Sequence, residues 1–175
     1  QGGFLWDWKD QGIFHRKHAS TSVEDRGTGK HTSSLMGSLS TDEGLFGGGL
    51  TVNSSKALDL TEAVTVQAEV RGNFGGATSQ GGGDNNRNQS DGYPIVTKGD
   101  TAYSLKVASS GTKVEFFIYT DTWKTVQAAL PAKWRSEFHK IVGTYDGKEM
   151  AILIDGKQVA SKKVEGKINT NAFDL

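Results

Sequence analysis

Apolar and polar residues alternate along much of the chain after Leu45. A period of two is typical of half-buried β-strands, and it predicts strands at 64–70, 103–107 and 114–119. Helical periodicity is nearly absent. The best candidate for a helix, 131–138, is long enough for about two turns at most. Several short strands divided by turn residues predict an all-β protein, either a sandwich or a barrel.

A stretch near the C-terminal end carries the strongest local signal. Two Asp-Gly pairs, Asp146-Gly147 and Asp155-Gly156, divide three runs that are rich in β-forming residues. Asp-Gly supplies the positive φ angles that a tight hairpin turn needs. We therefore predict a three-stranded antiparallel meander with strands at 138–145, 149–154 and 157–163.

Three segments outside this pattern differ in composition. Residues 1–18 are rich in aromatic side chains and end in a basic cluster, whereas residues 19–44 are mostly polar and are interpreted as a linker. Residues 72–92 are rich in Gly, Asn and Ser and show no strand pattern. A loop of this length inside a compact domain is either functional or disordered, and its composition favours mobility.

Composition and charge exclude several classes of protein. The 175 residues carry 20 basic and 20 acidic side chains, which argues against nucleic-acid binding by bulk charge and against a polybasic membrane anchor. No apolar run approaches the roughly 18 residues that a membrane-spanning helix needs. Because the chain has no cysteine, disulfides, thiolate zinc sites and thiol nucleophiles are excluded, while the compartment stays open.

The strand-rich region resembles laminin-G-like modules of the concanavalin-type sandwich. The family's opening strands are similar to GLFGGGLTVNSSKALDLTEAVTVQAEV, and its most recognisable block is similar to FHKIVGTYDGKEMAILIDGKQVA. By this resemblance, residues 45–175 form an antiparallel jelly-roll sandwich of the concanavalin A-like lectin/glucanase type, truncated at its C-terminus and preceded by a non-sandwich segment. Phe138 stands where the family usually has Trp, with Trp134 four residues earlier, which suggests a repacked core.

The N-terminal run QGGFLWDWKDQG is similar to a different family. It resembles a strand and loop near the end of the catalytic barrel of family 2 glycoside hydrolases of the β-galactosidase type. The resemblance implies that 1–18 is a remnant of such a barrel and that Trp6 is the sugar-platform residue of the parent enzyme. A flat indole suits the apolar face of galactose. For such a parent an exported location, periplasmic or extracellular, is expected.

The chain itself is predicted to have no catalytic residue. Glycoside hydrolysis needs two carboxylates about 5 to 9.5 Å apart. Near Trp6 only Asp7 and Asp10 are available, and the resembled family uses two Glu on earlier strands that this sequence lacks. The nearest approach to a stand-alone glycanase pattern, Asp146 to Glu149, falls on a turn. The four histidines show no metal-ligand spacing.

Calcium is the one cofactor that the resemblance suggests, because laminin-G-like folds often carry it. Asp84, Asp91 and Asp100 are the candidate ligands, since carboxylate oxygens suit a hard cation. The run that starts at Asp84 does not follow the EF-hand template, because Gln89 and Ile95 stand where that template has Gly and Glu. The alternative is a polar, flexible loop without an ion.

Trp123 is the candidate for sugar binding within the sandwich. It lies in Thr120-Asp121-Thr122-Trp123-Lys124 between two predicted strands, so that an indole and a carboxylate would lie together at a loop. Such a composition is common in carbohydrate sites. The alternative is a tryptophan that packs into the core from the start of a strand.

These observations favour a non-catalytic accessory domain of a β-galactosidase-type glycoside hydrolase, which binds carbohydrate or packs on the catalytic barrel. The alternative is a stand-alone laminin-G-like module that binds a glycan or a protein.

A sandwich that lacks one strand exposes an unpaired edge. The apolar segment 3–14 is therefore predicted to order against a sandwich of its own chain or of a neighbour, and the chain is predicted to self-associate.

Overall fold

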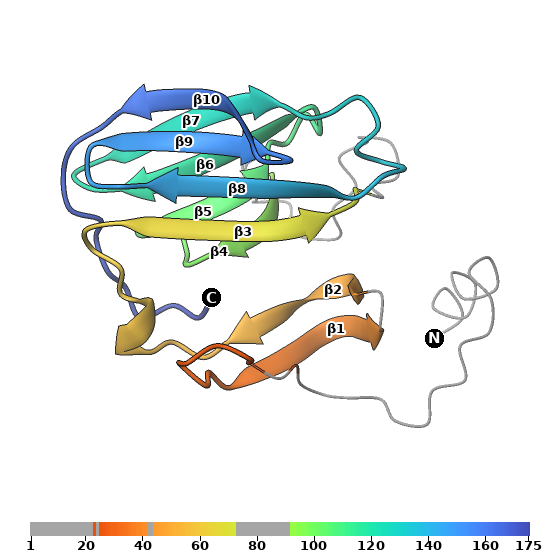
Figure 1. Cartoon of the computed structure of the whole chain (residues 1–175). Coiled ribbons are helices and arrows are strands. Elements are labelled where there is room, and N and C mark those ends of the chain that lie inside the picture. Colours follow the sequence, from red (N-terminus) through yellow and green to blue (C-terminus); the bar gives the residue numbers. More distant parts are fainter. Residues whose placement is uncertain (1–22, 24, 42–43, 73–91) are drawn as a thin grey trace, which may run out of the picture. The chain divides into compact units, whose positions relative to one another are not determined.

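The structure, a computed structural model, describes residues 23, 25–41, 44–72 and 92–175 (Figure 1). The chain divides into two compact units, residues 1–53 and residues 54–175. Several predictions concern residues outside the described set: Trp6, Asp7, Asp10, Asp84, Asp91, the N-terminal segments 1–18 and 3–14, and most of 72–92.

The described residues of the unit 54–175 form a sandwich of two antiparallel sheets with four strands each, which confirms the predicted all-β fold class. One sheet has the order β10-β9-β8-β3 and the other the order β4-β5-β6-β7, and Figure 1 shows one in front of the other. In the part of the chain that the structure describes, no helix is long and apolar enough to cross a bilayer. The elements are η1 (Lys56–Leu58), β3 (Val64–Val70), β4 (Tyr93–Thr97), β5 (Tyr103–Val107), β6 (Lys113–Tyr119), β7 (Trp123–Ala129), β8 (His139–Tyr145), β9 (Glu149–Ile154) and β10 (Lys157–Lys163).

The core lies between the two sheets and takes every second residue of the strands. Leu105 and Phe116 come from one sheet and Ile141 and Ile152 from the other, and all four are 0% exposed. Burying each such side chain contributes about 1.5–3 kcal/mol. Gly143 lets the sheets approach closely at Phe116, because a Cβ at Gly143 would lie 2.5 Å from Cδ2 of that ring.

The predicted meander is confirmed by strands β8, β9 and β10, which pair in sequence order. Ile154 lies opposite Lys157 across a two-residue turn. In that turn Asp155 and Gly156 have φ angles of 51° and 82°. Positive φ at both central residues is the backbone geometry that matches the twist of a two-residue hairpin. The Asp-Gly pair therefore sets the register at Lys157 and Gln158, and a shift of one residue between Gln158 and Ala160 changes it along the rest of β10.

The connection between β7 and β8 contains the segment 131–138, for which the sequence allowed about two helical turns at most. Residues 131–138 form successive turns and no helix, because the segment is too short to propagate one. Trp134 is 5% exposed, and a Cβ at Gly72 would lie 2.2 Å from its indole ring. Phe138 is 45% exposed, with the guanidinium of Arg71 4.8 Å from its ring centroid. Trp134 is therefore the buried aromatic residue of this region.

The unit 1–53 contains an antiparallel hairpin of β1 (Ser33–Thr41) and β2 (Gly44–Val52). Strand β1 lies inside 19–44, for which the composition indicated a linker. The difference has a simple cause: the run is mostly Ser, Thr and Gly, so its few apolar residues do not show a period of two. Pairing with β2, with Leu35 opposite Leu50, nevertheless makes this segment a strand.

Candidate functional site

Trp123, the first residue of β7, lies on the surface of the sandwich. It is 59% exposed, which excludes the alternative that it packs into the core. Its Nε1 donates a 2.8 Å hydrogen bond to the backbone oxygen of Asp100. Its ring meets that of Tyr119 edge-on, with centroids 5.4 Å apart and planes at 79°. The indole is therefore held in one orientation while much of its surface remains open to solvent.

An ionised carboxylate lies close by in the turn between β6 and β7. Nζ of Lys124 lies 2.8 Å from Oδ1 of Asp121, and Oγ1 of Thr120 donates to the same oxygen at 2.7 Å. These hydrogen bonds, the one from Lys124 foremost, hold the pKa of Asp121 well below its ordinary value. The turn therefore presents a fixed anionic acceptor beside an exposed aromatic ring.

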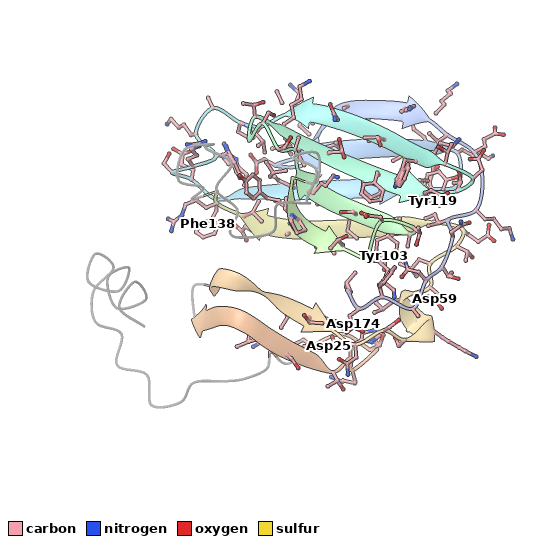
Figure 2. All side chains as sticks on the ribbon, turned by 180° about the vertical axis from the view of Figure 1, so that it is seen from behind. Asp25, Asp59, Tyr103, Tyr119, Phe138 and Asp174 are labelled. Atoms are coloured by element: carbon pink, nitrogen blue, oxygen red, sulfur yellow. The ribbon has the colours of Figure 1, made fainter. Side chains whose placement is uncertain are left out.

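Polar side chains continue the site along the outer face of the sheet β4-β5-β6-β7, the face that Figure 2 presents. Strand alternation places Thr125 and Gln127 on the same face as Trp123. Nε2 of Gln127 donates to one carboxylate oxygen of Glu115 at 2.5 Å, and Nζ of Lys106 lies 3.3 Å from the other oxygen. The outer face of this sheet therefore carries an exposed aromatic ring, Trp123, and a row of hydrogen-bonding side chains.

Of the three predicted calcium ligands, the structure describes only Asp100. Asp100 is exposed, but within the described ranges no three His, Asp or Glu side chains are grouped to hold a metal ion. Oδ1 of Asp59 is buried without a hydrogen-bond partner, and it too belongs to no such group. Calcium binding by Asp84, Asp91 and Asp100 stays a prediction. This prediction is tested by measuring the melting temperature with calcium and with a chelator, because a ligand that binds the native state raises the melting temperature.

Asp146 and His139 have structural roles. Oδ1 of Asp146 accepts the backbone N–H groups of Lys148 and Glu149, both at 2.8 Å, and so shapes the turn between β8 and β9. Nδ1 of His139 lies 2.7 Å from Oδ2 of Asp155. The hydrogen bond from His139 lowers the pKa of Asp155 most, and the one from the backbone N–H of Lys140 lowers it further. The spacing from Asp146 to Glu149 is therefore explained by a hairpin turn.

A sequence comparison decides the family. The model of the concanavalin A-like lectin/glucanases superfamily, in its laminin-G form, matches residues 43–175. The chain belongs to this superfamily. The match spans β2 and all strands of the sandwich, and it confirms the laminin-G-like part of the resemblance. It begins after the segment that resembles glycoside hydrolases.

Two solved structures with TM-scores above 0.5 share the fold of this chain at low sequence identity. The binding domain of botulinum neurotoxin serotype G has a TM-score of 0.54 and 15% identity over 90% of this chain. The binding domain of botulinum neurotoxin DC in complex with SialylT has a TM-score of 0.51 and 14% identity over 89%. The same domain in complex with rat synaptotagmin II has a TM-score of 0.47 and 14% identity over 83%.

These three likenesses concern part of each neurotoxin structure. The chain spans 44% of the serotype G chain and 36% and 34% of the two neurotoxin DC chains. At such identities the likeness shows the fold alone. A search of the curated proteins gave no match.

Near Trp123 and the turn that carries Asp100, the structure adds two residues that the sequence did not single out. Phe173 is 62% exposed and Lys98 is 1% exposed, and both lie at the turn that carries Asp100. No periodic pattern marks them, because they belong to a turn and to the C-terminal segment. The only available signal is Gly99 between Lys98 and Asp100, which is typical of a tight turn.

Proposed function

We propose that the superfamily sandwich is a non-catalytic carbohydrate-binding module and that Trp123 is its sugar-stacking platform. One observation carries the proposal: an indole that is 59% exposed is fixed by a 2.8 Å hydrogen bond to a backbone oxygen. Fully burying a large apolar side chain contributes about 1.5–3 kcal/mol. A ring that is both fixed and exposed therefore suits a ligand that covers it.

The surroundings of Trp123 favour a sugar over a purely apolar ligand. A pyranose ring has an apolar face, which an aromatic ring can cover, and hydroxyl groups that need hydrogen-bond partners. Asp121 offers an ionised acceptor, and Thr125 and Gln127 offer hydrogen-bonding groups on the same face. One structure that shares this fold, the binding domain of botulinum neurotoxin DC, was solved in complex with SialylT, and this prompts the choice of a sugar as the ligand to test.

The test is isothermal titration calorimetry with mono-, di- and trisaccharides of β-1,4-linked galactose, glucose and xylose. The wild type should bind at least one series, and Trp123→Ala should weaken that binding about tenfold or more, a loss of about 1.4 kcal/mol. Phe138→Ala is the matched control, because Phe138 is also exposed but lies at the other end of the sandwich from Tyr119, the ring partner of Trp123 (Figure 2).

Two outcomes would contradict the proposal: binding of no sugar in any series, and equal affinities for the wild type and Trp123→Ala. Both would favour a surface that contacts a protein, either a separate partner or another domain of the same polypeptide. A loss of affinity in Phe138→Ala as large as in Trp123→Ala would show that the effect is not local to the proposed site.

We also propose that this module belongs to a β-galactosidase-type glycoside hydrolase. The support is the resemblance of QGGFLWDWKDQG, with Trp6, to the catalytic barrel of that family. Residues 1–175 alone should release no nitrophenol from a nitrophenyl galactoside above a heat-inactivated control. Sequencing the coding region upstream of Gln1 should reveal the two catalytic Glu, and an upstream region without them would contradict this parent.

A further inference from the structure

Phe173 and Trp123 are the two most exposed large apolar side chains in the described part of the chain, at 62% and 59%. They come from distant segments but adjoin the same turn, Gly99-Asp100, between β4 and β5. Trp123 donates its indole hydrogen bond to the backbone oxygen of Asp100. A Cβ at Gly99 would lie 2.9 Å from Cδ2 of Phe173, so the phenyl ring lies against the turn.

A buried lysine holds the backbone of Phe173. Nζ of Lys98 donates to the backbone oxygens of Asn171, at 3.2 Å, and of Phe173, and to Oγ of Ser54 at 2.8 Å. Burying a charged group costs much free energy unless it is hydrogen-bonded, and here each of the three ammonium N–H groups has an acceptor. Charge-assisted hydrogen bonds therefore tie the C-terminal segment to the turn.

Hydrogen bonds in the reverse direction complete this attachment. Nδ2 of Asn171 donates to the backbone oxygen of Lys98 at 2.8 Å, and Oδ1 of Asn171 accepts the N–H of Phe173 at 3.1 Å. The N–H of Ser54 donates to Asp174 at 2.8 Å. The ring of Phe173 projects from a backbone that is fixed on both sides, and such preorganisation lowers the entropy cost of binding.

We propose that Phe173 is a second platform beside Trp123 and that the site takes an oligosaccharide of at least two sugar units. This inference rests on the proposed carbohydrate function. Both rings adjoin the two consecutive residues Gly99 and Asp100, and in this proposal one sugar chain reaches from one ring to the other across that turn. Thr101, an exposed residue of the same turn, adds a hydroxyl group, which accepts a 3.1 Å hydrogen bond from Nδ2 of Asn171 and can donate its own proton to a ligand.

The test compares affinities along one sugar series, by calorimetry, for the wild type, Phe173→Ala and the control Phe138→Ala. The probes are galactose, galactobiose and galactotriose, with the corresponding glucose and xylose series in parallel. The wild type should bind the di- or trisaccharide about tenfold more tightly than the monosaccharide. Phe173→Ala should lose most of that gain and keep its monosaccharide affinity within about twofold of the wild type. Phe138→Ala should retain the gain.

The possible failures are distinguishable. If Phe173→Ala keeps the full gain with chain length, or loses the same factor at every length, the second platform is overturned while the proposed function stands. If no sugar binds, or if Trp123→Ala binds as the wild type does, the proposed function fails and the second platform fails with it. Because the ring of Phe173 is exposed, circular dichroism should show Phe173→Ala folded as the wild type is.

Discussion

Two tryptophans of the sandwich unit, Trp123 and Trp134, have contrasting environments. Trp134 is 5% exposed, and its indole lies against the backbone of Gly72. Trp123 is 59% exposed, its N–H group is bound by the backbone oxygen of Asp100, and its ring forms a T-shaped pair with that of Tyr119. Both stand beside polar residues near a strand end, so their local sequences do not separate them.

The difference lies in what the rest of the fold brings to each ring. A residue without a side chain, Gly72, lets the chain pack directly on the indole of Trp134. At Trp123 the neighbouring turn offers a carbonyl to the indole edge and leaves much of the ring open. The first tryptophan is part of the buried structure, whereas the second is the platform that we propose for a ligand. The following predictions test this contrast.

The largest effect is expected at the buried ring. Trp134→Ala should lower the free energy of unfolding by about 3–5 kcal/mol, because it removes a buried aromatic side chain and leaves a cavity. Chemical denaturation followed by circular dichroism measures this change. A loss of about 1 kcal/mol or less would place Trp134 in the same class as exposed residues and would remove the contrast.

The next effect is expected at the buried lysine beside the exposed rings. Lys98→Met should cost about 1–3 kcal/mol, because it leaves the backbone oxygens of Asn171 and Phe173 without their donor. Lys113→Met is the control, since Lys113 is exposed on β6, and it should change stability by about 0.5 kcal/mol or less. Equal effects of the two substitutions would show that the attachment of the C-terminal segment contributes little.

A smaller effect on stability is expected at the exposed ring. Trp123→Ala should lower the free energy of unfolding by about 1 kcal/mol or less, since it removes one edge contact and one hydrogen bond at the surface. The same substitution should nevertheless cause the largest loss of sugar affinity. If Trp123→Ala destabilised the chain as much as Trp134→Ala, the ring would be a structural one.

The smallest effect is pH-dependent and lies away from both rings. The hydrogen bond from His139 lowers the pKa of Asp155, so this carboxylate stabilises the fold above its ordinary pKa of 3.8. The contribution is lost as the pH falls through the lower pKa of the folded state. Asp155→Asn, which tolerates the positive φ of this turn, should melt below the wild type near pH 7. The difference should vanish near about pH 2; a constant difference would contradict this linkage.

The sequence predicts the sandwich better than the site, and the reason is physical. Alternating apolar residues and Asp-Gly pairs are local signals, and they placed the strands at 64–70, 103–107 and 157–163 correctly. The linker interpretation of 19–44 missed β1, because Ser and Thr carry little hydropathy signal. At 131–138, where the sequence allowed about two helical turns at most, the structure has turns, because so short a segment does not propagate a helix.

The candidate site, by contrast, depends on contacts between distant segments. Trp123 and Asp121 are visible in the sequence as an aromatic residue and a carboxylate in one loop. Phe173 is held at the same turn by the side chains of Lys98 and Asn171, and a lysine is almost never fully buried unless its charge is paired or hydrogen-bonded. No local sequence pattern identifies such a lysine, so composition and periodicity could not predict that Phe173 lies near Trp123.

The most direct test of the central claim follows the indole N–H signals of the ¹⁵N-labelled protein by NMR during titration with the sugar that calorimetry selects. The chain has four tryptophans, and Trp123→Phe and Trp134→Phe assign the two signals of interest. The signal of Trp123 should shift in proportion to occupancy, because the sugar covers its ring, while that of Trp134 should stay in place. A saturating ligand that leaves the Trp123 signal unmoved, or that shifts Trp134 instead, would contradict the assignment of the site.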